Sequence, residues 1–177
     1  ISRRIFLAFS LLTAGMAYAQ LSIEITGAGA NRIPVTIVDF PGDPAASRAI
    51  TATVRADLER SGLFKLVDNA GLAFDENAAV NYADWKGKGA DALTAGSIGR
   101  SADGRMEARF RLYDTQKAVS LGGAAYVTSN VQLRAAGHRI ADFIYEKLTG
   151  EKGVFSTRIA YVVKSRGQFL LQIADSD

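Results

Sequence analysis

Two periods of apolar residues run through this chain, and each predicts a different kind of element. Residues 35–40 are an almost unbroken apolar run, as in a strand that is buried on both faces. Residues 106–113 instead alternate between an apolar face and a charged face. The charged face ends at Tyr113, and we expect it to meet solvent. Gly122 and Gly123 predict a β-bulge in a later strand. The remaining predicted strands span residues 64–67, 91–99 and 118–128.

Apolar residues at a spacing of four predict the first long helix. Ile50, Val54 and Leu58 form one stripe. Asp43 can cap the start of this helix, and Gly62 is a typical residue for ending it.

A second helix is predicted near the other end of the domain, where Asn130 can cap it and Gly150 ends it. Its apolar stripe consists of Leu133, Gly137, Ile140, Ile144 and Leu148. Two such helices and about five strands predict an α/β domain of the α+β type over residues 33–152, with two layers and a mixed sheet.

Between the predicted strands the pattern is lost. Residues 68–79 are rich in Asn, Asp, Ala and Gly, and we expect an exposed loop there. Residues 82–88 are expected to form about one turn of helix around Trp85.

The first nineteen residues have the pattern of a secretory signal peptide. Arg3 and Arg4 precede an apolar run over residues 5–16, and Ala17 and Ala19 supply the small-x-small pattern before a cut at Gln20. The run is shorter than the roughly 20 residues that a membrane-spanning helix needs. We therefore expect residues 1–19 to be removed on export, leaving a chain that does not insert into the membrane.

Removal of that segment also changes the charge. The whole chain has 21 basic and 18 acidic residues, and losing Arg3 and Arg4 leaves 19 against 18, a net charge of +1. With no basic stripe, we expect no nucleic-acid partner. The chain has no cysteine, so its stability must come from packing rather than from disulfides.

Each end of the domain carries a further segment. Residues 20–26 alternate like a strand, and residues 27–32 form a linker that contains Gly27 and Gly29. A free strand of this kind can pair with the exposed sheet edge of a partner, or lie as an edge strand in its own sheet. Residues 153–177 predict a linker and a short hairpin that cannot bury both faces alone, so we interpret them as the truncated start of another β domain.

Motifs for catalysis, cofactors and metals are weak throughout. His138 with Asp142 is compatible with a catalytic triad, but no Gly-x-Ser-x-Gly elbow accompanies it. We therefore expect a histidine that is hydrogen-bonded at a helix interface.

Asp57 and Glu59 point to opposite faces of the first helix and cannot share a metal or proton. Gly27 and Gly29 resemble a dinucleotide fingerprint, but Arg stands where the third glycine is needed. Residues 87–90 lack the spacing of a phosphate loop. We expect no enzyme activity, cofactor or metal.

One long stretch carries a family resemblance. Residues 136–150, Ala-Gly-His-Arg-Ile-Ala-Asp-Phe-Ile-Tyr-Glu-Lys-Leu-Thr-Gly, followed by residues 152–163, are similar to the stretch of TolB proteins that ends the amino-terminal domain and enters a β-propeller. Residues 33–40, 57–64 and 112–114 resemble other strands and a helix end of that family.

The resemblance implies a periplasmic component of the Tol-Pal system of Gram-negative bacteria, which supports outer-membrane integrity and constriction at cell division. It implies that a propeller, absent here beyond its first strands, binds Pal. It also implies that the carboxy-terminal domain of TolA binds the amino-terminal strand, here the residues Gln20, Leu21, Ser22, Ile23, Glu24, Ile25 and Thr26.

Two other functions stay open from the residues alone. A periplasmic ligand-binding or hydrolytic α/β domain of unrelated role is possible if the glycines near Gly96 and Gly99 leave room for a pocket. A propeller protein with a different role is the other alternative.

Overall fold

A computed structural model describes residues 32–175. The predicted signal peptide at 1–19, the strand at 20–26 and all but the last residue of the linker at 27–32 lie outside the described residues. The described chain forms a mixed sheet of five strands in the order β2-β1-β3-β4-β5. The strands are β1 (Ile33–Ile37), β2 (Phe64–Leu66), β3 (Ala92–Arg100), β4 (Met106–Asp114) and β5 (Val119–Thr128).

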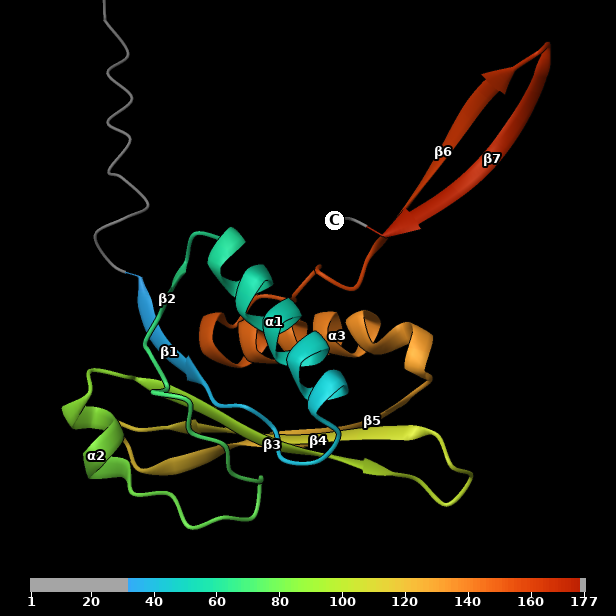
Figure 1. The fold of residues 1–177 in the computed structure, drawn as a ribbon. Helices are drawn as coiled ribbons and strands as arrows, with labels where there is room; N and C mark the ends of the chain where they lie inside the picture. Colours follow the sequence, from blue (N-terminus) through green and yellow to red (C-terminus); the bar gives the residue numbers. More distant parts are fainter. Residues whose placement is uncertain (1–31, 176–177) are drawn as a thin grey trace, which may run out of the picture.

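Both long helices cover the same face of this sheet (Figure 1). Helix α1 (Pro44–Arg60) begins where the Asp43 carboxylate accepts hydrogen bonds from the backbone of Ala45 and Ala46, at 3.0 and 2.9 Å. Helix α3 (Leu133–Thr149) ends at Gly150, whose left-handed φ of 80° is the conformation expected at that position. The two-layer α+β prediction is confirmed.

The start of α3 differs from the expected one. Asn130 lies in a 3₁₀ turn (Asn130–Gln132), and α3 begins after Gln132, whose side chain makes no capping bond. The capping prediction for Asn130 was therefore wrong. A tight turn comes first here and connects the end of β5 to the helix.

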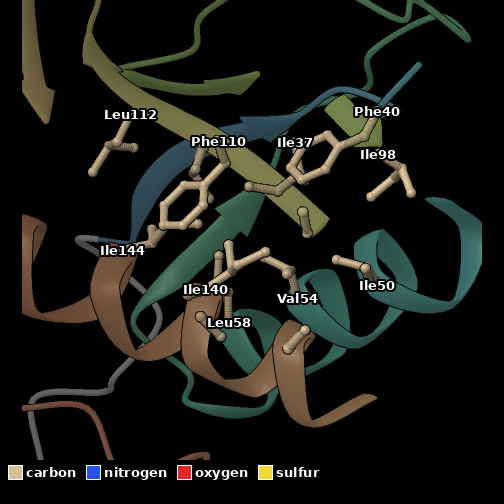
Figure 2. Close-up of a cluster of buried hydrophobic side chains, with 14 of the residues drawn as sticks. Ile37, Phe40, Ile50, Val54, Leu58, Ile98, Phe110, Leu112, Ile140 and Ile144 are labelled. Atoms are coloured by element: carbon tan, nitrogen blue, oxygen red, sulfur yellow. The ribbon is translucent and has the colours of Figure 1, made fainter. Parts of the chain in front are cut away.

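The main core lies between the helices and the sheet, as Figure 2 shows. Ile50, Val54 and Leu58 of α1 are fully buried and meet Ile140 and Ile144 of α3, also fully buried. The apolar stripes predicted for the two helices are therefore the faces that pack in the core.

The other face of the sheet is only partly open, which corrects two expectations. Helix α2 (Tyr82–Gly87) and the loop at 68–79 cover its β1–β3 side, and Phe74 packs with Trp85 against a second buried cluster. Tyr113, expected in solvent, is 6% exposed, and its hydroxyl donates to the backbone oxygen of Glu76 at 2.8 Å. The loop is not simply exposed, because its few apolar side chains complete this cluster.

The predicted bulge is present in β5. The pairing register with β4 shifts where Leu112 is opposite Gly122 and Tyr113 is opposite Ser120, which leaves Leu121 as the extra residue. Gly122 takes a φ of 112°, which favours glycine.

After α3 the chain forms the expected hairpin of β6 (Arg158–Ser165) and β7 (Gln168–Asp175), which extends away from the domain (Figure 1). Its turn residues Arg166 and Gly167 both have positive φ, at 49° and 81°, as in the type I′ turns of two-residue hairpins.

Candidate interaction surfaces

The amino-terminal exit of the domain lies at the start of β1. The Ile33 N–H donates to the backbone oxygen of Leu63 at 2.8 Å, so the strand is held from its first residue. Arg32, the preceding residue, is exposed. The predicted partner-binding strand Gln20–Thr26 and the cleavage residues Ala17 and Ala19 precede this point and lie outside the described residues.

The carboxy-terminal exit is anchored to α3. The Asp142 carboxylate accepts hydrogen bonds from the backbone N–H groups of Phe155, at 2.6 Å, and Ser156, at 3.1 Å. Gly153 lies so close that a Cβ there would be 2.4 Å from the Asp142 Cα. The segment before β6 therefore belongs to the packed domain rather than forming a free linker.

The hairpin beyond this anchor exposes apolar side chains on both faces. Such exposure marks a surface that another partner or further strands would cover. The most exposed of these side chains are Ile159 (53%), Val162 (61%), Phe169 (71%), Leu171 (70%) and Ile173 (64%).

His138, considered above as a catalytic residue, lies at the interface between α1 and α3. His138 Nδ1 lies 2.6 Å from the Asp57 Oδ2, and both side chains are at least 96% buried. Asp142, the predicted triad partner, holds the linker instead. The expectation of a hydrogen-bonded histidine between helices is confirmed, with a partner from α1.

Asp57 is the residue that sequence reasoning missed. The sequence placed Asp57 on the face opposite Glu59 without giving it a partner. Asp57 follows Ile50 and Val54 at intervals of seven and three residues, which is the spacing of the buried stripe. That spacing was the available signal. Arg60, one turn later, lies 3.4 Å from the other carboxylate oxygen of Asp57.

A pocket was considered near Gly96 and Gly99. Gly99 is exposed and has open space at its Cα, whereas Gly96 is tightly packed. A Cβ at Gly96 would lie 2.4 Å from the backbone oxygen of Arg109 and 2.7 Å from the Phe40 ring. Glycine is needed there for close packing, and no ligand space remains at its Cα.

Open clefts lie instead where α3 meets β5 and the base of the hairpin. One, of about 200 Å³, is lined by Tyr126, Arg139 and Arg158 among others. Burial raises the pKa of Tyr126 above its ordinary value, and the Arg139 guanidinium opposes that rise. The cleft can accept polar or anionic groups, but it brings no nucleophile and base together.

Residues 32–175 contain neither a metal-binding cluster of side chains nor a membrane-spanning helix. Their His, Asp and Glu side chains do not gather in groups of three that could hold a metal ion. None of the helices in this range is both long and apolar enough to span a bilayer.

The described residues form a two-layer α/β domain, and its carboxy-terminal hairpin leaves apolar side chains exposed. The chain belongs to the TolB amino-terminal domain family, whose model matches residues 21–121.

Individual relatives agree with this assignment. The Tol-Pal system protein TolB of Dechloromonas aromatica is 87% identical over 177 residues, which is all of this chain and 42% of that protein. The corresponding protein of a Polaromonas species is 51% identical over 170 residues, 95% of this chain and 40% of that one. The chain thus spans about two fifths of the length of the curated relatives it matches.

A solved structure is similar as well. The crystal structure of TolB from Acinetobacter baumannii matches with a TM-score of 0.68 and 34% sequence identity, over 87% of this chain and 38% of that one. The likeness confirms the fold described above.

Proposed function

We propose that this chain is the amino-terminal part of a periplasmic adaptor of the Tol-Pal system that acts by binding proteins and not by catalysis. Its strand Gln20–Thr26 binds the carboxy-terminal domain of TolA, and a propeller that begins at the hairpin binds Pal. The family match carries this proposal, because its relatives are named Tol-Pal system proteins. Through these two contacts the protein supports outer-membrane integrity and constriction at cell division.

Two features support the adaptor role. The hairpin after Thr157 exposes apolar side chains in the structure, and the sequence ahead of Arg32 alternates like a strand over residues 20–26. An alternating segment adds to a partner's sheet edge through main-chain hydrogen bonds, while alternate side chains fill pockets. Leu21, Ile23 and Ile25 are the side chains on the apolar side of that segment.

Calorimetry with the full-length mature protein and the TolA carboxy-terminal domain tests the proposal. Ile23→Asp, or deletion of residues 20–26, should abolish binding and leave the circular dichroism spectrum unchanged. Ser22→Asp is the matched control, because it places the same charge on the other side of the strand and should still bind. Equal affinities of the Ile23→Asp variant and the unchanged protein would contradict the proposal.

We also propose that export frees this strand. Cleavage between Ala19 and Gln20 would make Gln20 the first residue of the mature protein and leave residues 20–26 attached only at their carboxyl end. Amino-terminal sequencing of the periplasmic protein should begin Gln-Leu-Ser-Ile-Glu. A mature protein that keeps residues 1–19 would overturn this part.

A further inference from the structure

The side chains of β4 that point away from the two long helices form a charged row. Glu107, Arg109 and Arg111 alternate with the buried residues of this strand, so they lie on the face of the sheet opposite α1 and α3. The loop at 68–79 and helix α2 cover this face at its other end, where Tyr113 is buried. Figure 1 shows both long helices on the opposite side of the sheet and α2 beneath one end of it. The charged row therefore lies on the open half of this face.

Small residues flank both arginines of the row. Residues directly opposite each other in an antiparallel pair have their side chains on the same face of the sheet. Four small residues are placed in this way, two on β3 and two on β5: Ser97 and Ala125 opposite Arg109, and Ala95 and Gly123 opposite Arg111. Because no bulky side chain is directly opposite either guanidinium group, a partner can approach the sheet closely on both sides of β4.

The two arginines differ in the contacts they already make. Arg109 forms an ion pair of 2.5 Å with Glu107, whereas the exposed Arg111 forms no ion pair with any residue in the range 32–175. Burial raises the pKa of Tyr113, and the Arg111 guanidinium opposes that rise. A guanidinium is permanently charged and has five donor N–H groups. The row thus has a net positive charge and hydrogen-bond donors that the described residues leave available.

The spacing of the arginines defines what could bind them. Residues two apart in a strand are about 6.6–6.8 Å apart, and this is the interval between Arg109 and Arg111. An extended segment with carboxylates at alternate positions has the same interval. Each guanidinium can then bind one carboxylate through two parallel N–H···O hydrogen bonds.

We infer that the open face of β4 is a docking surface for an extended acidic segment of a protein partner, whose carboxylates, two residues apart, bind Arg109 and Arg111. The small flanking residues allow the segment to lie close to the sheet, and the charge of the row selects an acidic one. This surface is separate from residues 20–26 and from the hairpin. It goes beyond the proposed function and does not depend on it.

Fluorescence anisotropy with the full-length mature protein tests this surface. The probe is a fluorescein-labelled peptide of alternating glutamate and threonine, and the control peptide carries glutamine in place of glutamate. The unchanged protein should bind the glutamate peptide at low salt with a Kd below about 1 mM and should not bind the glutamine peptide. Arg111→Gln should weaken binding about fivefold, the contribution of one exposed ion pair. Absence of binding, or equal binding of the two peptides, would overturn the inference.

Arg48→Gln is the matched control for Arg111→Gln. Arg48 is exposed on α1, on the other side of the sheet, and its replacement changes the net charge by the same amount. It should leave the affinity unchanged. Ala125→Tyr keeps every charge but fills the space beside Arg109, so it should also weaken binding. The inference is overturned if Arg48→Gln weakens binding as much as Arg111→Gln, or if Ala125→Tyr has no effect.

Two further measurements locate the contact and identify the kind of ligand. In NMR spectra of the same protein, the glutamate peptide should shift the amide signals of Ser97, Arg109 and Ala125 and leave those of α1 in place; the reverse pattern would overturn the inference. Phosphatidylglycerol vesicles test for a membrane surface instead. Retention of the protein by these vesicles that Arg111→Gln abolishes, together with absence of peptide binding, would assign the row to lipid headgroups and overturn the inference.

Discussion

Asp57 and His138 are 81 residues apart in the sequence and join the two long helices by a hydrogen bond of 2.6 Å between Oδ2 and Nδ1. An ionised carboxylate only accepts hydrogen bonds, so with Asp57 ionised the donor of this bond is the His138 Nδ1–H. The pair fixes the register of α1 against α3 from inside the protein.

Replacing Asp57 by Ala should therefore lower the free energy of unfolding by about 1–3 kcal/mol, the penalty when a buried polar group loses its partner. Thermal unfolding followed by circular dichroism measures the change. Glu59→Ala, at an exposed position on the same helix, should stay within about 0.5 kcal/mol of the unchanged protein. Equal stabilities of the two variants would show that the buried pair contributes nothing.

Gly137 allows the same two helices to approach closely. A Cβ there would lie 2.7 Å from the Thr53 Cβ and 3.0 Å from the backbone oxygen of Ile50. Gly137→Ala should destabilise the domain, because an overpacking cost of about 1–3 kcal/mol exceeds the roughly 1 kcal/mol that Ala gains over Gly in a helix.

Gly87→Ala is the control for that substitution, because Gly87 is helical and a Cβ there meets nothing within 4 Å. Denaturant unfolding should show the Gly87 variant at least as stable as the unchanged protein. A Gly137 variant of undiminished stability would contradict the close approach of the helices.

Asp142→Ala should loosen the segment before the hairpin. Each hydrogen bond to a charged acceptor contributes about 1.5–3 kcal/mol, and two are lost here. Trypsin should then cut after Lys152 and Arg158, which flank the anchored residues, at least about tenfold faster. Glu146→Ala, one turn further along α3 and exposed, should be cut at the original rate; equal rates for both variants would argue against the anchor.

Asp103 should titrate at unusually low pH. Hydrogen bonds from the Ser101 hydroxyl and from Arg105 lower the pKa of its carboxyl from 3.8 to about 2. The stabilisation it adds to the β3–β4 turn is therefore complete above the unfolded pKa and is lost as pH falls through about 2. Carbon-detected NMR titration should give this midpoint, and Ser101→Ala should raise it; a midpoint near 3.8 in both proteins would contradict the turn geometry.

Much of the fold could be predicted because the hydrophobic period and the capping residues indicate the same helices and the same helix ends. Ile50, Val54 and Leu58 lie on the buried face that their spacing predicts, and Asp43 and Gly150 bound the helices as expected. The hairpin followed from two apolar runs around Arg166 and Gly167. Local patterns were sufficient in these places.

The rest depends on contacts between distant residues. The loop at 68–79 has no period, so its packing of Phe74 on Trp85, and the burial of Tyr113 beneath it, could not be predicted locally. Asp142 lies next to the helix stripe, but its partners are backbone groups 13 and 14 residues beyond it. The strand at 20–26 stays a prediction, because it lies outside the described residues.

The distance along the chain between Asp57 and His138 also determines when the domain can become stable. Strands β3, β4 and β5 are consecutive antiparallel neighbours and can pair through contacts that are local in sequence. Helix α1, in contrast, must find α3 across the 81 residues that separate Asp57 from His138. Contacts of such long range form slowly, so we expect the two helices to close over the sheet as a late step of folding.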